Sequence, residues 1–268
     1  MRSEEVVPNP ILRIPGVSND EFTPEEDEYA LQMARQIDLA EFINRPPAAI
    51  PSTAFDLYLR LSAELGQRVL VPRYHVAPAH RFPQPIHDVY TAYHHLLRLG
   101  FRPANVTLMG VSAGGNIALA LLHLLRIQDE LHLMPRACVL LAPCTDLALT
   151  SDSWRRNRDR CVVPTRPFDS PESLPRLYYG PDDGVAQAVQ HPLMSPIRGC
   201  LAGLPPVLAL IGGDDVFVDD ATALVDGIVA AGGSADLAVY PGRNHYSFLR
   251  GPAQLRDVYG RMRQFLTS

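Results

Sequence analysis

Short apolar runs alternate with amphipathic stretches along most of this chain. Continuous apolar runs predict buried strands at 68–71, 104–109, 137–142, 206–211 and 235–240. Apolar residues at helical spacing predict helices at 24–44, 52–66, 84–99, 113–127, 219–231 and 252–266. Strands and helices that alternate in this way are typical of an α/β protein with a mostly parallel, doubly wound sheet.

Two stretches interrupt the alternation. At 45–51, three prolines remove amide donors and end the preceding helix. Residues 146–204 are rich in Pro, Asp, Ser and Arg. We therefore expect an N-terminal helical or irregular segment at 1–51, a core formed by 52–145 and 205–268, and an insertion at 146–204 that lies as a lid over the carboxyl edge of the sheet.

The composition narrows the class of protein. The 268 residues carry a formal net charge of −5 and are 47% hydrophobic, which argues against disorder and against nucleic-acid binding. The chain opens with acidic residues, and no apolar run approaches the length of a membrane span. We expect a cytoplasmic protein without a membrane span. The cysteines lack metal-ligand spacing and are interpreted as buried or idle thiols, Cys138, Cys144, Cys161 and Cys200.

One motif stands between a predicted strand and a predicted helix. Residues 110–115 read G-V-S-A-G-G, and this G-x-S-x-G pattern is typical of a nucleophile elbow when a strand precedes it and a helix follows. Such a turn strains the serine backbone, and glycine neighbours let the helix approach the strand. Ser112 is therefore the candidate nucleophile, and the amide of Ala113 is the candidate oxyanion donor.

A serine hydroxyl needs a base to take its proton and an acid to orient that base. In this fold class the acid and then the histidine follow the serine along the chain. His245 follows the last predicted strand and is the candidate base. Asp214 and Asp215 follow the strand at 206–211 and compete for the role of the acid, whereas the next two aspartates, 219 and 220, are interpreted as helix caps.

From residue 57 onward the chain resembles the hormone-sensitive-lipase-like branch of the α/β-hydrolases. Residues 74–83, Y-H-V-A-P-A-H-R-F-P, are similar to that branch's Y-R-L-A-P-E-x-x-F-P segment. Residues 110–115 are similar to its G-D-S-A-G-G, and 242–245 match G-x-x-H. Residues 215–219 stand where the branch has D-P-L-x-D, and the resemblance therefore favours Asp215 over Asp214 as the acid.

The resemblance implies a serine hydrolase that cleaves carboxylic esters of small molecules, including acylated intermediates of secondary metabolism, with no cofactor. The sequence leaves open whether the protein forms a homodimer. The alternative is a catalytically weak or silent protein of the same fold that binds a small molecule.

One element of the resemblance is missing. The branch has an H-G-G-G loop, preceded by a strand, just upstream of the helix that begins here near Ser52, and its amides are the main oxyanion donors. Residues 45–51 hold R-P-P-A-A-I-P instead, so the N-terminal strands are expected to be missing or reduced. Three explanations stay open: residues near Ile11 fill the gap, the strands close up, or the sequence omits a segment. Each lost oxyanion donor typically costs about 10²–10³ in turnover, which predicts a weakened enzyme unless other amides replace them.

Overall fold

The computed structural model describes residues 61–163, 165–167, 170, 173–180, 183–249 and 252–268. The predicted helix at 24–44, the proline-rich stretch at 45–51 and the first part of the predicted helix at 52–66 lie outside these residues. The described end of that last helix, 61–65, is helical as predicted.

A parallel sheet of four strands organises the described chain. Its strands are β1 (Thr107–Val111), β2 (Ala137–Leu141), β3 (Val207–Gly212) and β4 (Ala235–Tyr240), and they lie side by side in that order. Neighbouring strands start level with one another, since Thr107 pairs with Ala137 and Val207 pairs with Ala235. Their carboxyl ends therefore lie at one edge, where the loops after β1, β3 and β4 meet.

Helices connect and cover the strands. The longer ones are α4 (Gln84–Arg98), α5 (Ala113–Ile127), α9 (Val218–Ala230) and α10 (Pro252–Thr267). The shorter ones are α6 (Asp152–Arg156), α7 (Leu174–Tyr179) and α8 (Val185–Ala188), with 3₁₀ turns η1 (Pro103–Asn105), η2 (Leu131–Leu133), η3 (Pro196–Arg198) and η4 (Ser247–Leu249). Among the described helices, none is both long and apolar enough to cross a bilayer.

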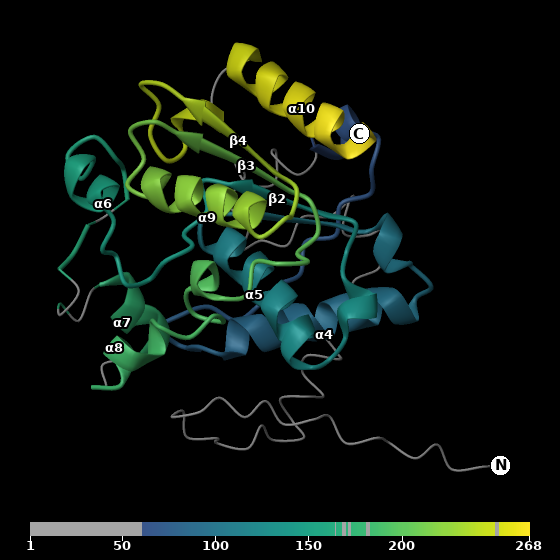
Figure 1. The fold of residues 1–268 in the computed structure, drawn as a ribbon, viewed down its shortest axis with the longest axis horizontal. Coiled ribbons are helices and arrows are strands. Elements are labelled where there is room, and N and C mark those ends of the chain that lie inside the picture. Colours follow the sequence, from purple (N-terminus) through teal and green to yellow (C-terminus); the bar gives the residue numbers. More distant parts are fainter. Residues whose placement is uncertain (1–60, 164, 168–169, 171–172, 181–182, 250–251) are drawn as a thin grey trace.

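Alternate residues of the buried strands face opposite layers of helix. On one face, Val207 and Ala209 of β3 pack in a cluster with residues of α5 and α9. On the other face, Leu208 and Leu210 pack in a cluster that includes Val258 of α10. Figure 1 shows α9 and α10 on opposite sides of β3 and β4. The sheet is therefore doubly covered, as the alternation of elements predicts.

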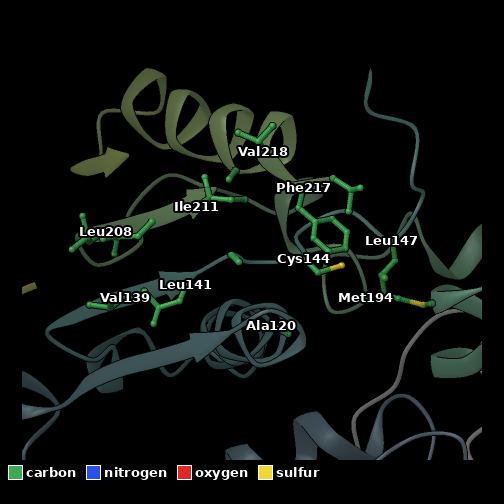
Figure 2. Packing of buried hydrophobic residues seen from close by; sticks show 14 of the residues in the cluster. Ala120, Val139, Leu141, Cys144, Leu147, Met194, Leu208, Ile211, Phe217 and Val218 are labelled. Carbon is green, nitrogen blue, oxygen red and sulfur yellow. The ribbon is translucent and has the colours of Figure 1, made fainter. Parts of the chain in front are cut away.

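The apolar core continues beyond the carboxyl ends of the strands. Leu147 and Met194 of the insertion pack in the same cluster as Cys144 and Phe217, beyond Ile211 at the end of β3 (Figure 2). Helices α6, α7 and α8 all belong to the predicted insertion at 146–204. The insertion is thus joined to the core by buried packing near the edge where the loops meet.

Two strand predictions differ from the structure. The strand predicted at 68–71 is wrong, because these residues have no strand partner in the described chain, although Val69 packs against the core. The strand predicted at 104–109 begins later, at Thr107, because Pro103–Asn105 forms a 3₁₀ turn. The remaining strands and the four long helices lie within one or two residues of their predicted bounds.

Candidate active site

Ser112 lies in the turn between β1 and α5. Its φ of 55° and ψ of −117° are rare for any residue other than glycine. The Ser112 amide donates to Leu141 O at 2.9 Å, which ties the turn to the neighbouring strand. A Cβ added at Gly110 would overlap the carbonyl group of Gly114. The strand and helix can therefore approach this closely only because residue 110 is glycine.

The elbow helix is also held by a residue that the sequence did not single out. Asn116 is buried, and its Nδ2 donates to Cys144 O at 3.0 Å and to Met194 O at 2.9 Å. These carbonyls belong to the loop after β2 and to the insertion. Asn116 therefore fixes the start of α5 against both segments, a role that a single polar residue in a helical pattern does not reveal.

Of the two candidate acids, Asp215 is the one that points into the site. Its side chain is completely buried, and its Oδ1 accepts a hydrogen bond from the Phe217 amide at 3.1 Å. Asp214 is 31% exposed, and its carboxylate lies 3.6 Å from the guanidinium of Arg160 at the surface. The turn after β3 thus separates two neighbouring carboxylates into different environments.

His245 joins the acid to the serine. Its Nδ1 lies 2.7 Å from Asp215 Oδ2, and its Nε2 lies 2.8 Å from Ser112 Oγ. The tautomer that satisfies both contacts has Nδ1–H donating to the carboxylate, while Nε2 accepts from the hydroxyl. Three side chains from three loops therefore meet in one hydrogen-bonded chain at the carboxyl edge of the sheet.

Backbone contacts hold the loops of Asp215 and His245 together. The Gly213 amide donates to Tyr240 O at 2.8 Å, and the Asp214 amide donates to Arg243 O at 2.8 Å. A Cβ added at Gly212 would overlap the backbone around Arg243. Glycine at the end of β3 therefore lets the two loops lie against each other.

Aromatic rings surround the imidazole. The ring of Phe217 lies 5.7 Å from that of His245, and the ring of Tyr246 lies 4.4 Å away, both edge to face. The His245 side chain is only 1% exposed. An imidazole that is shielded from water interacts more strongly with a buried carboxylate than it would at the surface.

The candidate oxyanion donor Ala113 is the first residue of α5. Amides in the first turn of a helix have no acceptor within the helix, and the helix dipole places partial positive charge there. The position of Ala113 next to Ser112 therefore suits an amide that receives a developing negative charge.

The aspartates interpreted as caps have different partners. Phe217 occupies the N-cap position of α9, and no side chain caps the helix there. Asp219 instead accepts hydrogen bonds from the amide of Ser153 and from the guanidinium of Arg156. Asp220 is buried, and burial together with the Asp146 carboxylate raises its pKa to about 7. Both aspartates therefore lie in the first turn of α9, where a helix was expected to begin, but the cap interpretation is wrong because no side chain caps the helix.

The four cysteines are free thiols, as expected, but one of them lies at the site. Burial raises the pKa of Cys138 to about 12 and also raises that of Cys144, so both stay protonated at neutral pH. Cys200 is exposed. The Sγ of Cys161 lies 3.8 Å from Asp215 Oδ1. This contact joins the insertion to the candidate acid.

Known proteins share this sequence pattern. Residues 49–249 match a protein family described as alpha/beta hydrolase fold. An acetyl-hydrolase of Streptomyces hygroscopicus is 34% identical over 195 residues, which are 73% of this chain and 62% of that protein. An esterase of Acinetobacter venetianus is 33% identical over 162 residues, which are 60% of this chain and 50% of that protein. The chain therefore spans about half to three fifths of the length of these two relatives.

A solved structure shares the fold. An esterase from the bacterial hormone-sensitive lipase (HSL) family superposes with a TM-score of 0.67 at 34% sequence identity. The superposition covers 77% of this chain and 67% of that one.

Proposed function

Since the chain belongs to the α/β-hydrolase fold family, in its hormone-sensitive-lipase-like branch, we propose that it is a serine hydrolase that cleaves carboxylic esters of small molecules. The observation that supports this proposal most strongly is the continuous hydrogen-bonded chain from Asp215 through His245 to Ser112. A buried aspartate, an imidazole and a serine hydroxyl in this order form the arrangement that makes serine nucleophilic.

In the proposed reaction, Ser112 Oγ attacks the ester carbonyl carbon while its proton passes to His245 Nε2. Asp215 accepts the Nδ1–H bond and stabilises the imidazolium. The tetrahedral intermediate then expels the alcohol, whose oxygen takes the proton from Nε2, and leaves an acyl group on Ser112. Water attacks this acyl-enzyme with His245 again as the base, which releases the carboxylic acid and restores the serine.

The oxyanion of both intermediates needs hydrogen-bond donors. The Ala113 amide, at the start of α5, is the donor that the described residues supply in this proposal. The H-G-G-G pattern occurs nowhere in the sequence. Because one lost donor costs about 10²–10³ in turnover, we expect slow hydrolysis unless amides upstream of Ser52 replace that loop.

The proposed substrates are small esters with short to medium acyl groups. Support comes from the acetyl-hydrolase relative and from the esterase relative. Acylated intermediates of secondary metabolism belong to this class.

Hydrolysis of p-nitrophenyl acetate and p-nitrophenyl butyrate tests the proposal. The wild type should release p-nitrophenol, and Ser112→Ala and His245→Ala should each lower kcat by about 10⁴-fold or more, because neither leaves a working nucleophile and base. Both variants should keep the Tm of the wild type within a few degrees. Turnover that persists in either variant would contradict the assigned roles.

The missing H-G-G-G pattern favours a second candidate, a silent member of the fold that binds a small ester without cleaving it. The same two esters separate the candidates. If an ester raises the Tm of the folded wild type but no p-nitrophenol is released, the protein is the binder and not the enzyme.

A further inference from the structure

One short segment of the insertion makes several polar contacts with the loop that holds Asp215. We call residues 153–161 the α6 clamp and residues 213–217 the acid loop. Ser153 Oγ donates to Val216 O at 2.7 Å, and the Ser153 amide donates to Asp219 Oδ2 at 2.8 Å. The Asp219 amide in turn donates a hydrogen bond to Ser153 Oγ at 3.2 Å. These contacts join the start of α6 to both sides of the turn between β3 and α9.

The side chain of Asn157 binds backbone carbonyls of the acid loop, including that of Asp215. Its Nδ2 donates to Asp215 O at 2.8 Å and to Gly213 O at 3.2 Å. The residue is only 2% exposed, so water cannot replace these bonds if the amide is removed. One planar amide group therefore fixes two carbonyls of the acid loop, including that of Asp215.

The turn that follows Asn157 brings a second contact to the carboxylate. Asn157 O accepts hydrogen bonds from the amides of Arg160 and Cys161, both at 2.9 Å. This turn places the Sγ of Cys161 3.8 Å from Asp215 Oδ1. The clamp therefore approaches Asp215 at its backbone and at its side chain.

The same segment also contacts the loop of the candidate base. Asn244 Nδ2, in the residue before His245, donates to Arg160 O at 3.3 Å. The aromatic rings of Trp154 and Phe217 lie 5.6 Å apart beside these polar contacts. The clamp thus touches both loops whose side chains must meet.

We propose that Asn157 is a positioning residue for the reaction, which fixes the backbone of Asp215 so that its carboxylate meets His245 Nδ1. This inference rests on the proposed function, because it assigns the acid a role that Asn157 supports. Within the described chain, no hydrogen bond joins Asn157 to the serine or the imidazole, whereas its amide binds the carbonyls of Asp215 and Gly213. A displacement of about 1 Å in such a group can lower turnover by about 10²-fold.

Asn157→Leu tests the proposal, because leucine has a similar volume and removes both donated bonds. The variant should lower kcat on p-nitrophenyl acetate by about 10- to 100-fold and leave KM within about twofold of the wild type. The decisive measurement is the same substitution in an Asp215→Asn background. If Asn157 acts through Asp215, the double variant should be no slower than Asp215→Asn alone, measured with excess enzyme over a single turnover.

Tyr93→Phe is the matched control. Tyr93 is also buried and donates one side-chain hydrogen bond to a backbone carbonyl, Leu133 O at 2.6 Å, but it lies on α4 away from the three loops. It should lower Tm and leave kcat unchanged. The proposal is overturned if Asn157→Leu has the same kcat as the wild type. It is also overturned if the double variant is slower than Asp215→Asn alone.

If Asn157→Leu does not fold, Ser153→Ala is the second variant. It removes the bond to Val216 O, the bond from the Asp219 amide and the 3.4 Å contact with Ser151 Oγ. It should lower kcat in the wild type and not in Asp215→Asn, and equal losses in both backgrounds would contradict the inference. An inert wild type refutes the proposed function instead. The two failures are therefore distinguishable.

Discussion

Ser112 occupies a backbone conformation that costs free energy, on the order of 1–3 kcal/mol for a residue with a side chain. The turn is maintained by its surroundings: the amide of Ser112 bonds to Leu141 O, and Gly110 leaves room for the carbonyl of Gly114. The glycines of the motif predict this turn from the sequence. The partners that stabilise it, such as Asn116, come from distant segments and leave no local signal.

The choice of acid is a residue-scale prediction. Asp215→Asn should lower kcat by about 10²–10⁴-fold, because an amide no longer stabilises the imidazolium or fixes its tautomer. Asp214→Asn should change kcat less than about threefold, since the Asp214 side chain faces Arg160 at the surface. Steady-state kinetics on p-nitrophenyl acetate measures both. The reverse ranking would assign the acid to Asp214.

At the scale of elements, continuous apolar runs predicted β2 and β3, each of which lies between two neighbouring strands. Cys138 and Val139 of β2 lie between β1 and β3, so a continuous apolar run there has packing on every side. The run at 68–71 also holds three consecutive apolar residues, but Val69 only packs against the core without joining the ladder. Strand propensity depends on whether a partner strand is available, and a short apolar run does not carry that information.

The junction between α9 and the insertion should make stability depend on pH. Burial and the Asp146 carboxylate raise the pKa of Asp220 to about 7, above its ordinary value near 4. The folded state therefore holds a proton that the unfolded state has already lost between about pH 4 and pH 7. Over this window the contribution of Asp220 to stability falls as the pH rises, and above about pH 7 the loss is complete.

Asp220→Asn should remove this loss. We expect the variant to exceed the wild type in Tm by about 2–10 °C at pH 8, which corresponds to about 1–3 kcal/mol for a chain of this size, and by much less at pH 4.5. Asp226→Asn, on the exposed face of the same helix, is the control and should give the same small change at both values. A gain for Asp220→Asn that is equal at both pH values would contradict the assigned pKa.

At the scale of the whole molecule, the three candidate side chains come from positions far apart in the chain. His245 lies 133 residues after Ser112 and 30 residues after Asp215. Their convergence was predictable because parallel strands bring their carboxyl ends to one edge, and each candidate follows a strand. The α6 clamp was not predictable, since Ser153 and Asn157 stand in a polar segment without periodicity. Their roles depend on how the insertion folds back onto the core.

Covalent labelling shows whether Ser112 is a reactive nucleophile. The protein is incubated with a fluorophosphonate probe, digested, and the modified peptide is identified by mass spectrometry. We expect one phosphonate adduct on Ser112 in the wild type, none in Ser112→Ala, and much slower labelling in His245→Ala, because only a serine with a base beside it attacks the probe. A folded wild type that stays unlabelled, or that carries the adduct on another residue, would contradict the assignment of Ser112 as the nucleophile.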